Sequence, residues 1–232
     1  MRTYSVILLC IVCIIVFIIA YILYTYTAHK PANVSKSCIV EERIPTSNGI
    51  IEIVDKECQE GLPHTYDENT IRLTRSMYES SHVDDVLIHE RVHLDQKRNP
   101  SDWLQFYKTY WKYTVSLSPP NNIPHHYILS LRPNPDTDDS PWVTWNNRYV
   151  FFPTSSANNK LKDAKVTIWD LQLNRIVDIP LEWKEMFCSE KLACPHQYEH
   201  PHEISAEFLT NKNRSSAGLQ LLRWYTMRLA NK

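Results

Sequence analysis

The amino-terminal part of the chain carries an unbroken apolar run. Residues 6–24 hold no charged side chain, and a helix rising about 1.5 Å per residue would make the run about 28 Å long, close to the thickness of a bilayer core. A cleaved signal peptide normally has a shorter apolar region that ends at a small-residue site, and this run has neither feature. The pattern therefore predicts one uncleaved transmembrane helix within residues 1–26, a tether over 27–37 and a folded domain over 38–232.

Strand-like patterns follow the tether. Residues 38–44 and 50–58 read as two strands around a turn, because Asn48-Gly49 between them is a strong hairpin signal. Residues 70–74 alternate between polar and apolar side chains, which is typical of a short edge strand.

Helical spacing replaces this alternation after Ser81. Ser81 with Asp84 three residues later forms a start of the capping-box kind, and the acidic first turn suits the positive end of a helix dipole. Apolar residues then recur three and four positions apart, which predicts an amphipathic helix over about 82–97. A second helix is predicted over about 101–115, because aromatic side chains between Trp103 and Trp111 recur along one face and form a core-packing stripe.

The rest of the chain mixes loops, hairpins and helices. Its predicted elements are a long irregular loop rich in proline, asparagine and aspartate over 118–141, two hairpins over 142–152 and 165–179, a helix from Pro201 to about Asn211, and a last helix capped by Ser215 or Ser216. Together these elements predict an α+β fold without internal repeats.

Composition favours a well-packed globular domain. The 232 residues include 7 tryptophans and 13 tyrosines but only 3 glycines, which indicates a core rich in aromatic side chains and argues against disorder. The formal net charge is −1, and the basic residues form no stripe. A nucleic-acid partner is therefore not expected.

Cysteine usage bears on the compartment. Four cysteines lie outside the apolar run, an even number that suits two disulfide bonds in an oxidising environment. Folding about the predicted turn brings Cys38 nearly opposite Cys58, within disulfide reach, and Cys188 with Cys194 would close a small loop. Reduced thiols are the alternative.

Two possible N-glycosylation sequons, at Asn33 and Asn213, point in the same direction, although such sequons also arise by chance. We therefore expect a single-pass membrane protein whose domain lies on the exoplasmic or luminal side.

The strongest chemical signal is the pattern His-Glu-Arg-Val-His inside the first predicted helix. His89 and His93 are one helical turn apart on one face, so their imidazoles can converge on one zinc ion. Glu90 lies about 100° further round the helix, where it can reach a metal-bound water. Zinc would lower the pKa of that water and polarise a carbonyl, while Glu90 would act as general base. Surface histidines flanking a salt-bridging glutamate are the structural alternative, and Asp95 is expected to be a solvated carboxylate.

A catalytic zinc site needs a third protein ligand, and the helix predicted to begin at Pro201 offers candidates. Glu203 and Glu207 share one face of that helix, so one carboxylate can bind zinc while the other orients a histidine. His200 or His202 as third ligand would instead make a three-histidine site.

The two motifs together resemble those of the glutamate-type zincin metallopeptidases, which pair HExxH with a downstream helix of the form ExxxD or ExxAD. Glu203-Ile-Ser-Ala-Glu207 is similar to that second element, with glutamate in place of the final aspartate. The resemblance implies a zincin-like domain with Glu203 as third ligand and Glu207 supporting His89 or His93. It covers these two motifs only, and predicted hairpins make the interval between them longer than in most of the family.

The expected function is that of a membrane-anchored metallopeptidase, a hydrolase that holds one zinc ion and cleaves a peptide or protein substrate. A non-catalytic membrane-attached interaction or envelope protein, with a structural zinc or none, is the alternative from another class. A third possibility is hydrolysis of a non-peptide amide or ester by the same metal chemistry.

Overall fold

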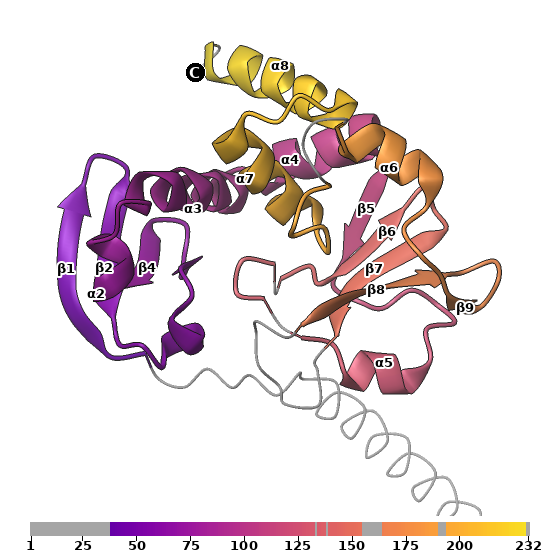
Figure 1. Cartoon of the computed structure of the whole chain (residues 1–232), viewed down its shortest axis with the longest axis horizontal. Helices are drawn as coiled ribbons and strands as arrows, with labels where there is room; N and C mark the ends of the chain where they lie inside the picture. The colour runs from indigo at the N-terminus through magenta and orange to yellow at the C-terminus, as the bar shows by residue number, and fades with distance from the viewer. Residues whose placement is uncertain (1–37, 133, 138, 155–163, 190–193, 231–232) are drawn as a thin grey trace, which may run out of the picture. The chain divides into compact units, whose positions relative to one another are not determined.

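Two β-sheets and a set of helices make up the part of the chain that the computed structural model describes (Figure 1). This part comprises residues 38–132, 134–137, 139–154, 164–189 and 194–230. Its mixed α+β architecture confirms the predicted fold class. The predicted transmembrane helix, the tether and Asn33 fall outside the described residues. Within the described ranges, none of the helices combines the length and the apolar character that crossing a bilayer requires.

The described elements, in chain order, are β1 (Val40–Thr46), β2 (Gly49–Val54), the 3-10 helix η1 (Cys58–Gly61), β3 (His64–Thr65), β4 (Thr70–Thr74), α2 (Arg75–Tyr78), α3 (Val83–Arg98), α4 (Pro100–Phe106), the π-helical turn η2 (Tyr107–Trp111), β5 (Tyr113–Ser116), α5 (His125–Leu129), β6 (Trp142–Trp145), β7 (Tyr149–Thr154), β8 (Lys165–Asp170), β9 (Arg175–Ile176), α6 (Leu181–Phe187), α7 (Pro201–Asn211) and α8 (Ser216–Ala230).

The four-stranded sheet grows from the predicted hairpin, with strand order β1-β2-β4-β3. β1 and β2 pair antiparallel about the turn at Asn48-Gly49, and the φ of Gly49 is 137°, a value that residues with a Cβ rarely adopt. β4 pairs parallel with β2 and antiparallel with β3, so it is an inner strand. The prediction of an edge strand there is wrong. The edge position belongs to β3, which has only two residues and therefore shows no pattern in the sequence.

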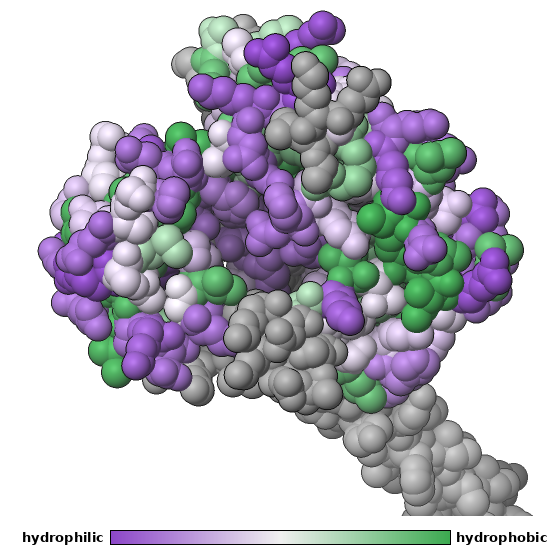
Figure 2. Space-filling view, in the orientation of Figure 1, coloured by the Kyte–Doolittle hydropathy of each residue, from purple (hydrophilic) through white to green (hydrophobic). Residues whose placement is uncertain are grey.

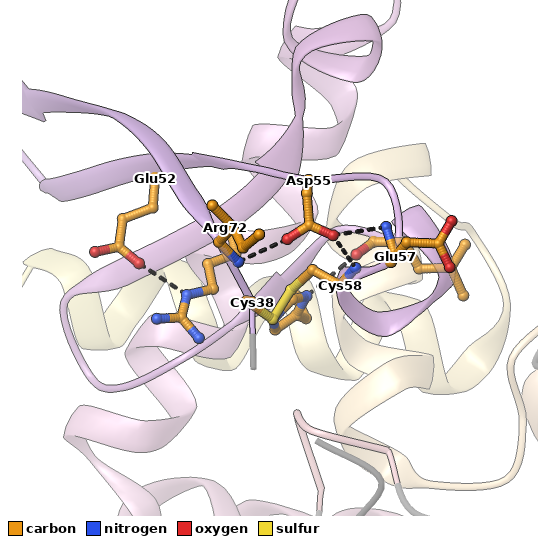
Figure 3. Close-up of a disulfide and its surroundings, with 9 residues drawn as sticks. Cys38, Glu52, Asp55, Glu57, Cys58 and Arg72 are labelled. Carbon is orange, nitrogen blue, oxygen red and sulfur yellow. Dashed lines mark hydrogen bonds and ion pairs between the residues drawn. A yellow bond between two sulfur atoms is a disulfide. The ribbon is translucent and has the colours of Figure 1, made fainter. Parts of the chain in front are cut away.

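A disulfide bond between Cys38 and Cys58 closes the open end of the hairpin, as predicted (Figure 3). Asp55 fixes the chain on both sides of this bond. Its carboxylate accepts hydrogen bonds from the backbone N–H groups of Ile39 at 2.6 Å, Glu57 at 2.9 Å and Cys58 at 3.1 Å. The loop that follows Cys58 is therefore tied to the sheet by a covalent bond and by a carboxylate.

The helix that carries the HExxH pattern is α3, within one residue of its predicted bounds. Its capping residue is His82, without a side-chain cap, so the capping box proposed for Ser81 is wrong. The Oγ of Ser80 instead accepts the N–H of His82 at 3.3 Å. Leu87 and Leu94 join the buried apolar residues of the four-stranded sheet, which places the opposite face of α3 toward the rest of the domain.

The second predicted helix ends earlier than expected. α4 runs into η2, Lys112 stops the helix with a φ of 59°, and β5 begins at the next residue. The prediction of helix up to residue 115 is therefore wrong, since pairing of residues 113–116 with β6 competes successfully with helix. The prediction that the aromatic stripe packs in the core is confirmed for the buried residues Trp103, Phe106, Tyr107 and Trp111.

The two predicted hairpins, β6–β7 and β8–β9, are confirmed and join β5 in one antiparallel sheet of order β5-β6-β7-β8-β9. One face of this sheet packs against helices in an aromatic core that includes Trp111, Phe151, Trp183 and Phe187. The long loop before β6 is irregular as predicted, apart from the short helix α5. The predicted disulfide bond between Cys188 and Cys194 follows α6.

The last two helices begin where the sequence predicts them. The Oγ of Ser215 accepts the N–H of Gly218 at 3.1 Å and so caps the start of α8. Asn213, in the turn before it, is 7% exposed, and its Oδ1 accepts the N–H of Ser215 at 2.7 Å. A glycan on this side chain would have to displace the turn, so the folded structure does not favour the predicted sequon.

Asp95 ties three helices together and is not a solvated carboxylate as predicted. It accepts the indole N–H of Trp103 at 2.9 Å and the side-chain amide of Asn99 at 2.9 Å, and it pairs with Arg228 of α8. The prediction failed because these partners come from α4 and α8, whose packing against α3 is not a local property.

Candidate metal centre

Packing of α7 against α3 brings together three side chains of the types that ligate metals. His89 and His93 extend from α3, and Glu203 extends from the first turn of α7. The Nε2 atoms of the two histidines are 3.1 Å apart, and Oε2 of Glu203 lies 3.3 Å from that of His89 and 3.4 Å from that of His93. These three residues can hold a metal ion.

The spacing of the three atoms fits a small tetrahedral ion. Zinc binds imidazole nitrogen and carboxylate oxygen at about 2.0–2.2 Å, so two ligand atoms of a tetrahedral site lie about 3.4 Å apart. The observed separations of 3.1, 3.3 and 3.4 Å match that value. Two imidazoles and one carboxylate form a donor set that suits zinc.

Gln96 fixes the orientation of the His93 ring. The amide nitrogen of Gln96 donates to the carbonyl of His202 at 3.1 Å and to Oγ of Ser205 at 2.8 Å, and it lies 3.2 Å from the hydroxyl of Tyr107. Its amide oxygen therefore faces Nδ1 of His93, which donates to it at 2.7 Å. With one proton held on Nδ1, Nε2 points at the centre and can coordinate a cation once its own proton is displaced.

Asn134 orients the carboxylate of Glu203 in the same way. Its Nδ2 donates to Oε1 of Glu203 at 2.7 Å, which leaves Oε2 directed at the two histidines. Asn134 comes from the irregular loop before β6, whose conformation local patterns do not predict. The contact of Gln96 with His93 could have been predicted from the sequence, because Gln96 lies three residues after His93 on the same helix face.

Glu90 is buried beside this group. Its side chain is not a surface salt bridge, because the residue is 3% exposed and its Oε2 has no hydrogen-bond partner among the described residues. Burial raises the pKa of Glu90 well above its usual value, and the negative charges of Asp136 and Glu203 act in the same direction. A buried carboxylate oxygen at this place needs a partner that the described side chains do not supply.

The electrostatics of the centre favour a positive charge. Burial disfavours the charged imidazole of His93, yet the facing carboxylates of Glu203 and Asp136 raise its pKa to about 10. Burial likewise opposes ionisation of Glu203, but His93 and His89 hold its pKa well below the usual range. A cation held between these side chains therefore meets a complementary environment.

Glu207 does not support either histidine of α3. Its carboxylate accepts the backbone N–H groups of His196 at 2.9 Å and Gln197 at 3.3 Å, and its Oε1 lies 3.2 Å from Nδ1 of His196. The predicted role of Glu207 is therefore wrong. Gln96 and Asn134, which the motifs did not indicate, orient the metal-binding side chains instead.

His200 and His202 do not join the group. Nε2 of His200 donates to the carbonyl of Ser140 at 3.1 Å, while its Nδ1 accepts the N–H of His202 at 3.1 Å and caps α7. Neither ring nitrogen of the buried His202 has a hydrogen-bond partner among the described residues. Burial, and then the proximity of His93, lower the pKa of His202 to about 4. Among the residues described, the three-histidine alternative therefore has no geometric support.

A second group of metal-type side chains lies at Cys38, Cys58 and His64. Its two sulfur atoms form the disulfide bond, and the His64 ring lies 3.9 Å from the sulfur of Cys58. A disulfide offers no thiolate, so this group is not a metal site in the oxidised protein.

The centre opens into a cleft of about 520 Å³. His89, Glu90 and Glu203 line it together with residues before β3 and with the segment around Asn134. Figure 2 shows hydrophilic residues gathered in a hollow between the elements of the two sheets. The side chain of His89 is 20% exposed, whereas those of His93 and Glu203 are buried, so the approach to the centre passes over His89.

No family model, curated protein or solved structure matches this chain. Its function is therefore argued from the site alone.

Proposed function

We propose that this protein is a membrane-anchored, zinc-dependent peptidase with a zincin-like domain. One observation carries the proposal: three side chains from two helices converge with the spacing of zinc ligands at the wall of a cleft, beside a buried Glu90 whose Oε2 has no hydrogen-bond partner among the described residues. A structural zinc site would normally be closed by four protein ligands, whereas the described residues supply three.

Each residue of the centre has a separate proposed role. His89, His93 and Glu203 would hold the ion. Zinc, when bound, lowers the pKa of a water molecule and polarises a carbonyl oxygen. Glu90 would take a proton from water in the cleft and return it to the leaving amine, a role that suits a carboxylate whose pKa is raised by burial. Gln96 and Asn134 orient the ion-binding side chains.

A peptide substrate suits the cleft. Its volume of about 520 Å³ lies within the range of pockets that hold a small ligand or a few residues of a peptide. Both predicted disulfide bonds form, which supports an oxidising compartment, and the apolar run over residues 6–24 supports attachment to a membrane. We therefore place the domain on the exoplasmic or luminal side.

Zinc analysis together with measurements of peptide hydrolysis tests the proposal. The full-length protein in detergent micelles should bind about one zinc per chain, and His89→Ala should abolish that binding. Glu90→Gln should retain zinc but lose hydrolysis of a mixed peptide library by at least about 100-fold, the effect of a lost general base.

Matched controls separate these effects from damage to the fold. His126→Ala and Glu185→Gln alter exposed residues of α5 and α6 and should leave zinc content and turnover unchanged. Zinc binding without hydrolysis of any library peptide by the wild type would reject the peptidase. That result would favour a membrane-attached interaction protein.

A further inference from the structure

A partly buried arginine with unused hydrogen-bond donors lines the same cleft as the candidate metal centre. The side chain of Arg132 is 12% exposed, and its Nε and Nη1 have no hydrogen-bond partner among the described residues. Its ion pair with Glu60 joins Nη2 and Oε1 at 3.6 Å, longer than a hydrogen bond. Burial lowers the pKa of Arg132, but a guanidinium stays charged at any physiological pH. Such a weakly compensated charge destabilises the folded protein unless a ligand pairs with it.

The backbone holds Arg132 in place next to the metal centre. Its N–H donates to the carbonyl of Pro153 at 2.9 Å, and Leu131 forms a β-bridge with Thr154 at the end of β7. Two residues later, Asn134 donates to Glu203. Since two residues span at most about 7 Å, the Arg132 backbone lies close to the group that would hold zinc.

The charges around the cleft make this position specific for an anion. Asp85 and Asp136 also line the cleft, so the wall beside them repels a carboxylate. Lys165, the other lysine or arginine on the described wall, is exposed to solvent and therefore contributes little. A substrate carboxylate would be stabilised at Arg132 and disfavoured beside the two aspartates.

Resting on the proposed peptidase function, we propose that Arg132 is a specificity-determining residue that binds a carboxylate of the substrate within about two residues of the cleaved bond. Nε and Nη1 are unused donors, but the surrounding protein covers both in the unbound structure, so the guanidinium has to turn toward the cleft before a carboxylate can bind it through two parallel hydrogen bonds. Glu60 occupies this place weakly in the unbound protein, and the substrate carboxylate displaces it. The carboxylate belongs either to an acidic side chain or to the carboxyl terminus of the peptide.

Three isosteric peptides distinguish these two sources. One carries an internal glutamate and an amidated carboxyl terminus, the second an internal glutamine and a free carboxyl terminus, and the third a glutamine and an amide. The zinc-loaded, full-length protein should cleave one of the first two about 10- to 100-fold faster, in kcat/KM, than the third. Equal rates for all three would overturn the proposal and leave the peptidase standing.

Three variants and one control assign the preference to Arg132. Arg132→Met should remove it, and Arg132→Lys should keep only part of it because the two-donor edge is lost. Glu60→Gln removes the competing carboxylate and should strengthen the preference several-fold, whereas Glu68→Gln, at an exposed position, should not change it. Should Arg132→Met fail to fold, the Glu60→Gln result still decides, since an unchanged or weaker preference would contradict the proposal.

Binding measured without turnover separates this inference from the peptidase. Calorimetric titration of the zinc-loaded Glu90→Gln protein with the same peptides should show tighter binding of the carboxylate peptide, with the difference lost in Glu90→Gln/Arg132→Met. If wild type cleaves nothing but this difference appears, the carboxylate subsite stands and the peptidase fails. If neither appears, both proposals are rejected.

Discussion

Nδ1 of His93 donates a hydrogen bond to the amide oxygen of Gln96 at 2.7 Å, three residues further along the same helix. The orientation of this amide is determined by its nitrogen, which donates to Ser205 and to the backbone carbonyl of His202 on α7. One buried side chain therefore couples the tautomer of a candidate metal ligand to the packing of the two helices that form the centre.

Replacing Gln96 should weaken metal binding. Gln96→Leu removes the acceptor that holds the His93 ring, so zinc affinity should fall about 10- to 100-fold, the usual cost of losing such an orienting partner. Competition with a chelator of known affinity measures the change. Gln105→Leu, at an exposed position on α4, is the matched control and should bind zinc as wild type does. An unchanged affinity in Gln96→Leu would show that helix packing alone orients His93.

The contact between Asn134 and Glu203 should matter in the same way. Asn134→Ala leaves Oε1 of Glu203 without its donor, and zinc affinity should fall by about 10-fold or more. Asn134→Asp places a second carboxylate against the first, and in the metal-free protein this like-charge pair should also lower the melting temperature. Asn121→Ala, on the exposed part of the loop, should change neither quantity. Equal zinc affinities for Asn134→Ala and wild type would show that Asn134 does not support metal binding by Glu203.

The two disulfide bonds should contribute unequally to stability. The Cys38–Cys58 bond joins residues 20 apart and the Cys188–Cys194 bond joins residues 6 apart. Loop-closure entropy then gives about 3 kcal/mol for the first and about 2 kcal/mol for the second. Denaturant unfolding of Cys38→Ala/Cys58→Ala and of Cys188→Ala/Cys194→Ala measures both, and the reverse order would contradict the entropic account.

Stability should depend on pH through Glu199. Burial, and then the charge of Glu203, raise its pKa from 4.5 to about 8. Below pH 4.5 both the folded and the unfolded chain hold the proton, so there is no effect. Between pH 4.5 and 8 the unfolded chain releases the proton while the folded chain keeps it, so stability falls as pH rises, and the loss is complete above pH 8.

Glu199→Gln should abolish this loss. In the metal-free protein, the melting temperature of the variant relative to wild type should rise between pH 4.5 and 8 and then level off. Glu185→Gln, on the exposed side of α6, should show no such trend. A constant difference between Glu199→Gln and wild type would mean that the folded protein does not raise this pKa.

Local signals in the sequence predicted much of the fold. The Asn48-Gly49 turn, the proline that opens α7 and the helical spacing of α3 depend on neighbouring residues, so the elements they predict are present. Both disulfide bonds followed from a hairpin and from a short loop. The predictions failed where distant partners decide, as for the inner strand β4 and for residues 113–116, which pair with β6 instead of continuing a helix.

The sequence by itself determined that His89 and His93 share one face of a helix, because four residues make about one helical turn. Only the tertiary structure decided which residue of α7 meets them. Neighbouring helix positions differ by about 100°, so the angle at which α7 packs on α3 turns Glu203 toward the histidines. The same packing leaves His202 beside Tyr107. It also decided the contacts of Gln96, since these join residues that the chain alone does not bring together.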